Sequence, residues 1–235
     1  MEHRVAGLAI VAVTCWRLAG TSFAQDNYQF SDPNVENTFR YARVAVGGGV
    51  SKLKALIQTG PVRVRLDTSK GAIVIAVHRD WAPHGADRFL ELVTAGYFDD
   101  SRFFRVVKGQ WAQFGIAGDP AIAAAWRTRT IPDDPPAQSN VRGRVAFAFK
   151  DPGGRTTQVY ISLRDNSYQD AQGFVPFGEV VEGMDVADAL NSEYGENAGG
   201  GIRAGRQQPL FDGGNAYLDR EYPRLDRLIR ARIVR

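Results

Sequence analysis

From Pro61 onward the chain is a series of short apolar runs separated by turn residues. VRVRLD alternates apolar and polar residues with a period of two, TSKG supplies turn residues, and AIVIAVH is a more apolar run. This pattern predicts a β-hairpin over residues 62–78. Further strands are predicted at residues 102–107, 112–116, 143–149, 158–163 and 176–181, with LIRARIVR as a closing strand. The chain must therefore bury its core mainly between strands.

Two segments carry a helical pattern. WAPHGADRFLELVTAGYF places Pro83 at a helix start, spaces its apolar residues by three and four, and ends with Gly96 as a C-cap. MDVADALN, residues 184–191, predicts a second, shorter helix, whereas GENAGGGIRAG and DGGNAY are expected to be loops. Many short strands with two helices favour a closed β-barrel capped by helices, because closure removes exposed strand edges.

The first 24 residues have the pattern of a cleaved secretory signal. They contain Arg4, an apolar run over residues 6–16, and small residues before a cleavage point at Ala24. The apolar run is too short to span a bilayer about 30 Å thick, so we expect no stable membrane insertion after cleavage. An N-terminal helix of the domain is the alternative, and Arg17 near the cleavage point is its main support. A signal sequence implies a periplasmic or secreted protein.

Residues 25–60 are expected to be a tether, partly disordered or weakly helical. They are rich in polar and turn residues, and Gly47–Lys52 lacks the Gly-Lys-Ser/Thr ending of a phosphate-binding loop. Residues 61–235 are expected to form one domain, since a chain of 235 residues with 44% hydrophobic residues can bury one sizeable core.

Composition excludes several classes of function. The net charge of +3 is spread along the chain, so no basic stripe indicates a nucleic-acid partner. Cys15 is the single cysteine and lies in the predicted signal, so the mature chain would have no thiol for disulfides, catalysis or zinc. His78 and His84 have no further ligands at a metal-binding spacing, so no metal is expected. Neither Gly-x-Ser-x-Gly nor His-Glu-x-x-His occurs, which leaves a hydrolase without support.

Arg105 lies inside the apolar run RFFRVV, where an arginine is unexpected. A guanidinium stays charged at physiological pH, so in a core or cleft it needs a partner or a task. Three interpretations are open: an ordinary arginine at a sheet edge, a structural ion pair with an acid such as Asp119, or a catalytic hydrogen-bond donor.

Several blocks of the chain resemble the cyclophilin-type peptidyl-prolyl cis-trans isomerases, in particular a bacterial exported form. These blocks are GAIVIAVHRDWAPHGADRFLELVTAGYFDDSRFFRVV, QFGIAGDP, TTQVYISLRDN and DAQGFVPFGEVVEGMDVADAL, in the family's order. The resemblance is strong over residues 61–192 and weaker up to residue 234. It implies a mainly β fold, an eight-stranded antiparallel barrel capped by two helices, and catalysis of X-Pro rotation without a cofactor.

The resemblance also implies which residues form the site. Arg105 matches the family's catalytic arginine, Gln113 the glutamine that holds the substrate carbonyl, and Gln158 a glutamine near the substrate backbone. The remaining matches are Tyr160 at the pocket floor, Phe174 at its edge, Trp111 at its wall and Phe149 in the segment that pairs with the bound peptide. Each of these glutamines and aromatic residues could instead be an ordinary structural residue.

Three pocket positions depart from the family's pattern. Phe104 stands where a histidine or similar residue is usual, Gln110 replaces an apolar aromatic residue, and Gln169 replaces a leucine. Two polar walls would weaken binding of a proline ring, although Trp111 could cover the ring instead. The alternative function is therefore a cyclophilin-fold module of low activity that binds proline peptides or acts as a chaperone. In either case the partners are proline-containing polypeptides, and we expect a monomer.

Overall fold

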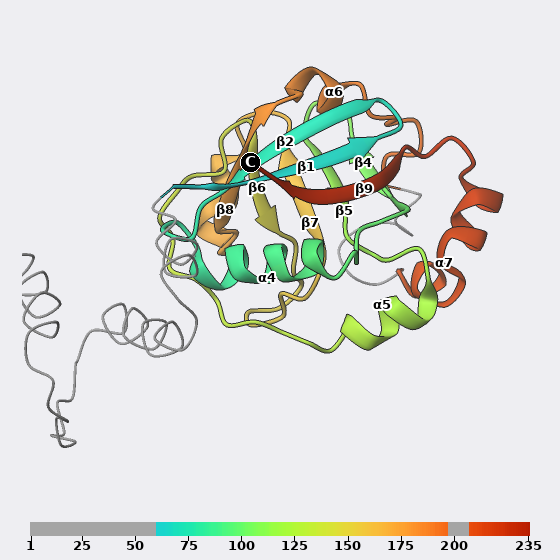
Figure 1. Ribbon diagram of the computed structural model, residues 1–235, viewed down its shortest axis with the longest axis horizontal. Helices are drawn as coiled ribbons and strands as arrows, with labels where there is room; N and C mark the ends of the chain where they lie inside the picture. The colour runs from blue at the N-terminus through green and yellow to red at the C-terminus, as the bar shows by residue number, and fades with distance from the viewer. Residues whose placement is uncertain (1–59, 197–206) are drawn as a thin grey trace, which may run out of the picture. The chain divides into compact units, whose positions relative to one another are not determined.

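A computed structural model describes residues 60–196 and 207–235 of the chain. In this part of the chain, nine strands form one curled antiparallel sheet, and helices lie at its ends and along one side (Figure 1). The predicted signal sequence at residues 1–24, and the predicted tether as far as residue 59, lie outside the described residues.

The sheet has the spatial order β3-β9-β1-β2-β8-β6-β7-β5-β4. In chain order the strands are β1 (Val62–Thr68), β2 (Gly71–Val77), β3 (Ser101–Arg102), β4 (Arg105–Val107), β5 (Trp111–Phe114), β6 (Arg144–Phe147), β7 (Val159–Ser162), β8 (Pro176–Glu182) and β9 (Arg227–Val234). The two ends of this order, β3 and β4, are consecutive in the chain and are separated only by Phe103 and Phe104. The chain itself therefore connects the two ends of the curled sheet.

The strands lie where the sequence pattern predicts them, with one difference in their number. The β1–β2 hairpin pairs Val62 with Val77 and turns between Thr68 and Gly71, as the TSKG turn indicates. The strand predicted at residues 102–107 is two short strands, because the chain leaves the ladder at Phe103 and Phe104 to bury both rings completely. β9 confirms the predicted closing strand and pairs with both β1 and β3.

Helix α4 (Pro83–Thr94) confirms the first predicted helix. Pro83 occupies its first turn, and the chain leaves the helix through Gly96 at a φ of 66°. The free N–H groups of His84 and Gly85 donate to the carboxylate of Asp134, which lies in a distant loop. Helix α4 lies below the sheet in Figure 1. The buried residues of α4, including Phe89, belong to the hydrophobic core.

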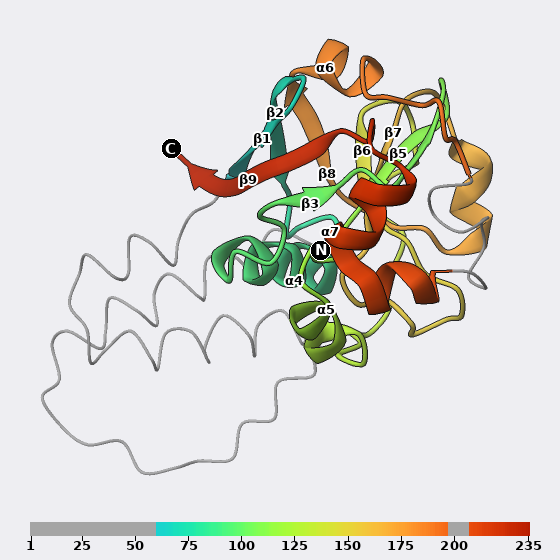
Figure 2. The ribbon, with the colours of Figure 1, turned by 90° about the vertical axis from the view of Figure 1, so that its right-hand side faces the viewer.

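The predicted second helix is confirmed as α6 (Met184–Asp188), and two further helices were not predicted. These are α5 (Pro120–Trp126) and α7 (Gln208–Glu221), which lie side by side in Figures 1 and 2. The expectation that DGGNAY is a loop was wrong, because these residues lie within α7, which kinks at Gly214. A short 3₁₀ helix also spans Ser167–Gln172.

The core fills the inside of the curled sheet and the space between the sheet and α4. Phenylalanine rings dominate it: the Phe89 and Phe177 rings lie 4.9 Å apart, and the Phe103 and Phe114 rings lie 5.2 Å apart. No helix among the described residues is long and apolar enough to cross a membrane. The outer face of β4, β5 and β7 is left for polar and aromatic side chains, and it carries the candidate site.

Candidate active site

Strand register brings the main candidate residues into one row on the outer face of the sheet. Arg105 of β4 pairs with Gln113 of β5, and Gln113 pairs with Tyr160 of β7. Residues opposite each other on neighbouring strands project from the same face. The alternate residues on these strands, such as Ala112 and Ile161, are fully buried in the core. The strand period of two therefore separates the candidate site from the core.

The guanidinium of Arg105 has partners on two edges and one face. Its Nη1 donates to Oε1 of Gln113 at 2.8 Å, while Nε and Nη2 donate to the two carboxylate oxygens of Glu196 at 3.0 and 2.9 Å. Its central carbon lies 4.9 Å from the centre of the Trp111 ring. Arg105 is thus an ion-paired arginine in a cleft, with two of its five N–H donors left without an acceptor among the described residues.

The ion pair differs from the one considered from the sequence. Asp119 does not reach Arg105: its side chain accepts from the N–H groups of Ala121 and Ile122 and caps α5. The ion pair with Arg105 is instead formed by Glu196, which lies on a segment that is distant in the chain. The suggestion of an acidic partner for Arg105 was therefore right in kind, but wrong in the residue.

Side-chain amides continue from Arg105 across the cleft. Nε2 of Gln113 donates to Oε1 of Gln158 at 2.8 Å, and Nε2 of Gln158 donates to Oε1 of Gln207 at 2.8 Å. The amide of Gln207 also donates back to Oε1 of Gln158 at 3.2 Å. Amide groups held in this way can offer a peptide substrate their remaining hydrogens and lone pairs.

Tyr160 forms the floor of the cleft, and its hydroxyl is fixed by two side-chain oxygens. The hydroxyl oxygen lies 2.8 Å from Oδ1 of Asn140 and 2.8 Å from Oε1 of Gln169. Asn140 is itself oriented, since its amide donates to Oδ1 of Asp170 and to the carbonyl of Phe174. Burial, and then the charge of Asp170, hold the pKa of Tyr160 well above its usual value, so the phenol stays neutral.

An aromatic wall stands beside this floor. The Phe149 and Phe174 rings lie 4.5 Å apart, and the Phe174 ring meets the Tyr160 ring edge to face at 5.8 Å. Behind the wall, the buried guanidinium of Arg155 lies 4.1 Å from the centre of the Phe149 ring and donates to the carbonyl of Gly173. The guanidinium of Arg155 therefore packs on the Phe149 ring and also holds the backbone next to Phe174.

These residues line a cleft of about 560 Å³. It contains eight of the ten residues proposed from the sequence: Arg105, Trp111, Gln113, Phe149, Gln158, Tyr160, Gln169 and Phe174. A mixture of aromatic walls and a few fixed polar groups is typical of a site that binds an apolar group in a defined orientation.

Phe104 and Gln110 do not line the cleft. Phe104 is 1% exposed and belongs to the core together with Phe103, at the point where the chain leaves the sheet just before Arg105. Gln110 lies in the turn between β4 and β5, where its carbonyl accepts from the amide of Asn166. The structure therefore does not bring these two residues together with the other eight that the sequence proposed.

Sequence reasoning missed four residues that belong to the site. Glu196 lies within the glycine-rich stretch GENAGGGIRAG, which was interpreted only as a loop, and Gln207 follows that stretch. Tyr168 lines the cleft from the 3₁₀ helix with a half-exposed ring. Asn140, which holds Tyr160, lies in an irregular segment with no motif to mark it.

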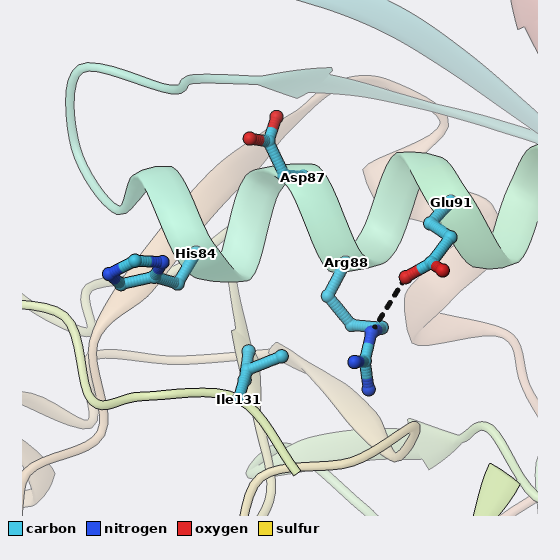
Figure 3. Close-up of a pocket in the computed structure, with 5 residues that line it drawn as sticks. All are labelled: His84, Asp87, Arg88, Glu91 and Ile131. Carbon is cyan, nitrogen blue, oxygen red and sulfur yellow. Dashed lines mark hydrogen bonds and ion pairs between the residues drawn. The ribbon is translucent and has the colours of Figure 1, made fainter. Parts of the chain in front are cut away.

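A second pocket lies beside α4 and is a weaker candidate. Figure 3 shows His84, Asp87, Arg88 and Glu91 projecting from the helix, with Ile131 on the neighbouring loop. The pocket measures about 340 Å³ and is shallow. Arg88 is occupied by Glu91 at 3.0 Å and by the carbonyl of Thr156 at 3.1 Å, so it offers little to a ligand. Within the described residues, no cluster of acidic, histidine or cysteine side chains is suited to a metal ion.

Comparison with known proteins assigns this architecture to a family. Residues 63–207 match the model of the family described as cyclophilin type peptidyl-prolyl cis-trans isomerase/CLD. Peptidyl-prolyl cis-trans isomerase A of Dickeya dadantii is 29% identical over 150 residues, which cover 62% of this chain and 79% of that protein. Peptidyl-prolyl cis-trans isomerase B of Escherichia coli is 30% identical over 136 residues, with coverage of 54% and 82%.

The fold has a solved counterpart. The crystal structure of a cyclophilin type peptidyl-prolyl cis-trans isomerase of Cryptosporidium parvum superposes with a TM-score of 0.54 at 18% identity, and covers 74% of this chain and 98% of that one. This likeness confirms the predicted mainly β, cyclophilin-like fold. The sequence predicted it as a closed barrel of eight strands capped by two helices, and the described residues show it as a curled antiparallel sheet of nine strands with further helices.

Proposed function

Because this chain belongs to the cyclophilin-type peptidyl-prolyl cis-trans isomerases and is an enzyme of that type, we propose that Arg105 is its catalytic residue and that it acts on exported proteins. Rotation about the X-Pro bond has a barrier of about 18–20 kcal/mol, because the amide loses its conjugation as it twists. No bond is broken, so the enzyme only has to bind the twisted imide more tightly than the planar forms.

The guanidinium supplies what the twisted imide needs. As the bond rotates, the proline nitrogen becomes pyramidal and gains a lone pair, which a fixed and permanently charged donor stabilises. Arg105 has two N–H donors without an acceptor among the described residues, and it faces a cleft with an aromatic floor and wall. This placement of spare donors beside a site for an apolar ring is the observation on which the proposed mechanism rests.

The neighbouring side chains have separate roles in this proposal. Phe149, Tyr160 and Phe174 hold the proline ring, and Trp111 covers it from the side of Arg105. Gln113 and Gln158 bind the peptide backbone through hydrogens and lone pairs that their mutual bonds leave free. The proposed ligand is an extended X-Pro segment.

The alternative of a low-activity module that binds proline peptides or acts as a chaperone rested on two polar walls. Gln110 does not line the cleft, and the side-chain oxygen of Gln169 faces the Tyr160 hydroxyl. Five aromatic side chains line the cleft instead: Trp111, Phe149, Tyr160, Tyr168 and Phe174. Aromatic rings are therefore available to a proline ring, within a cleft that polar side chains also line, and this favours a working isomerase over a weak docking surface.

The mechanism is tested by a protease-coupled assay on an Ala-Pro peptide. Arg105→Ala should lower kcat/KM by at least about 100-fold, which corresponds to about 2.7 kcal/mol of lost transition-state stabilisation. Arg142→Ala is the control, because Arg142 pairs with Asp188 on the surface and does not line the cleft. Equal rates for wild type and Arg105→Ala would remove Arg105 from the mechanism.

We also propose that the substrates are unfolded or folding proteins of the periplasm or the secreted fraction. The support is the signal-like pattern of residues 1–24, followed by a mature chain without cysteine. Expression in a bacterial host and intact-mass measurement of the exported protein should show a chain that starts at Gln25. A retained Met1 in the cytosolic fraction would contradict export. Size-exclusion chromatography of the same sample tests the expected monomer.

A further inference from the structure

The carboxylate of Glu196 binds the guanidinium of Arg105 along one edge. Its two oxygens accept from Nε at 3.0 Å and from Nη2 at 2.9 Å, which is the bidentate geometry that fixes the plane of an arginine most firmly. The arginine side chain is 17% exposed and the glutamate side chain 31% exposed, so water screens this pair less than a surface pair.

Glu196 is presented by an anchored turn. The backbone N–H of Asn191 donates to the carboxylate of Asp226 at 2.6 Å, and Gly195 closes a turn by donating to the carbonyl of Ser192 at 3.1 Å. Between them, the Tyr194 ring packs edge to face on the Tyr222 ring at 5.2 Å. The segment that carries Glu196 is therefore tied to the C-terminal part of the domain.

Three contacts together leave the guanidinium little freedom. Glu196 holds one edge, Gln113 accepts from Nη1, and the Trp111 ring lies against the face. A long arginine side chain has many rotamers in solution, and a donor acts on a transition state only while it is correctly placed. The carboxylate uses the Nε hydrogen and one Nη2 hydrogen, and Gln113 uses one Nη1 hydrogen, so the remaining two of the five hydrogens point in a fixed direction.

We propose that Glu196 is a positioning residue for catalysis, which holds the Arg105 guanidinium in the orientation needed by the twisted imide. This inference rests on the proposed function of Arg105. It assigns a role to a glutamate outside the sheet, on a segment that sequence analysis interpreted only as a loop. The opposite role is that the carboxylate competes with the substrate for Arg105, and the experiment below separates the two roles.

The direct test is Glu196→Gln, which keeps the size of the side chain and removes its charge. The amide of glutamine would place N–H groups against the N–H groups of Arg105, so the bidentate pair of hydrogen bonds is lost. We expect kcat to fall by about 10- to 100-fold while KM stays within about twofold, because orientation is lost and the binding surface is kept. Exchange spectroscopy by NMR on an Ala-Pro peptide at several concentrations gives both constants.

The matched control is Glu193→Gln. Glu193 lies three residues earlier on the same segment and also pairs with an arginine, Arg224, but both side chains are at least half exposed and neither lines the cleft. This variant should have wild-type kcat and KM. Both variants should also match wild type in near-ultraviolet circular dichroism, so that a change in kcat is not mistaken for misfolding.

A double-mutant cycle ties the effect to Arg105. If Glu196 acts only through Arg105, then Arg105→Ala combined with Glu196→Gln should be no slower than Arg105→Ala alone. Additive losses would show that Glu196 acts elsewhere and would overturn the inference.

Two further outcomes would also overturn it. An unchanged kcat in Glu196→Gln would mean that catalysis does not need the ion pair between Glu196 and Arg105. A lower KM with a higher kcat/KM would mean that Glu196 competes with the substrate for Arg105. In either case a strong loss in Arg105→Ala would leave the proposed function intact. If Arg105→Ala has wild-type activity, the proposed function itself fails, so the two failures are distinguishable.

Discussion

At the scale of single residues, the Tyr160 hydroxyl ties the floor of the cleft to its surroundings. It carries one proton and lies between the side-chain oxygens of Asn140 and Gln169. A phenylalanine would keep the same ring surface for a proline, so the hydroxyl serves the architecture of the site more than contact with the substrate.

Tyr160→Phe should therefore lower the free energy of unfolding by about 1–3 kcal/mol, because the hydroxyl's one proton is lost and a buried side-chain oxygen is left without its donor. Urea unfolding measures this loss, and KM for an Ala-Pro peptide should change little. Tyr168→Phe is the control, since Tyr168 lines the same cleft but is 51% exposed. A Tyr160→Phe protein as stable as wild type would show that these hydrogen bonds do not contribute.

The buried tyrosines also predict how stability depends on alkaline pH. Burial raises the pKa of Tyr97, and burial followed by nearby negative charge raises the pKa of Tyr160 well above its usual value. In the unfolded chain both groups titrate near pH 10. The unfolded state then binds fewer protons than the folded state, so stability is complete below about pH 10 and is lost as the pH rises further.

Each such group should contribute a slope of at most about 1.4 kcal/mol per pH unit, over the range between its pKa in the unfolded chain and its raised pKa in the folded protein. Urea unfolding of wild type and Tyr160→Phe between pH 8 and 11 measures the slope, which should be smaller in the variant. An identical slope in both proteins would mean that Tyr160 ionises freely in the folded state.

The sequence was enough to identify the residues that regular strands place in the site. Arg105, Gln113 and Tyr160 lie in one row because the period and pairing of strands fix their faces. Glu196 could not be found in this way, because an irregular segment has no period that relates its residues to a face of the sheet.

At the scale of elements, glycines decide where segments can approach each other. Gly115 follows β5 with a φ of 104°, and a Cβ there would lie 2.3 Å from the carbonyl oxygen of Thr157. Gly214 allows α7 to kink, and a Cβ there would lie 2.2 Å from the carbonyl oxygen of Gly118. DGGNAY resembles a loop in sequence, but its Gly214 serves this close contact and not a turn.

Gly115→Ala should destabilise the protein by about 3 kcal/mol or more, since it combines a strained φ with a clash against the backbone next to β7. Gly109→Ala is the matched control: its φ is 65°, but no atom lies within 4 Å of the added Cβ. It should lose only about 1–2 kcal/mol from strain. Urea unfolding compares the two variants, and equal losses would show that the clash is relieved by small movements.

At the scale of the whole molecule, β9 joins the end of the chain to its first described strand. It pairs with β1 from Arg63 and Val234 onward, and its other end pairs with β3. A strand that alternates Ile229, Ala231 and Ile233 with arginines was predictable as a closing strand, but its partners were not. Pairing over such a long separation in sequence leaves no local signal.

Leu228→Ala tests this closure, because Leu228 is completely buried where β9 meets both neighbours. The variant should lose about 2–5 kcal/mol of stability, and urea unfolding should show the loss in the transition of the whole domain. Its neighbour on the opposite face, Ile229, is 53% exposed, so Ile229→Ala should stay within about 0.5 kcal/mol of wild type. Similar losses of stability in both variants would mean that the buried and the exposed face of β9 contribute equally to the stability of the domain.

The bonds that link Arg105, Gln113, Gln158 and Gln207 have one more consequence. An amide can usually be turned over without changing its outline, but a guanidinium has only hydrogens to give. Its permanent sign obliges the oxygen of Gln113 to face it, which turns the nitrogen of Gln113 toward Gln158 and so fixes the oxygen of Gln158 as well. The charge of Arg105 therefore determines which atom of each amide, the oxygen or the nitrogen, faces its neighbour as far as Gln207. An arriving peptide meets hydrogen-bond donors and acceptors whose positions are already fixed.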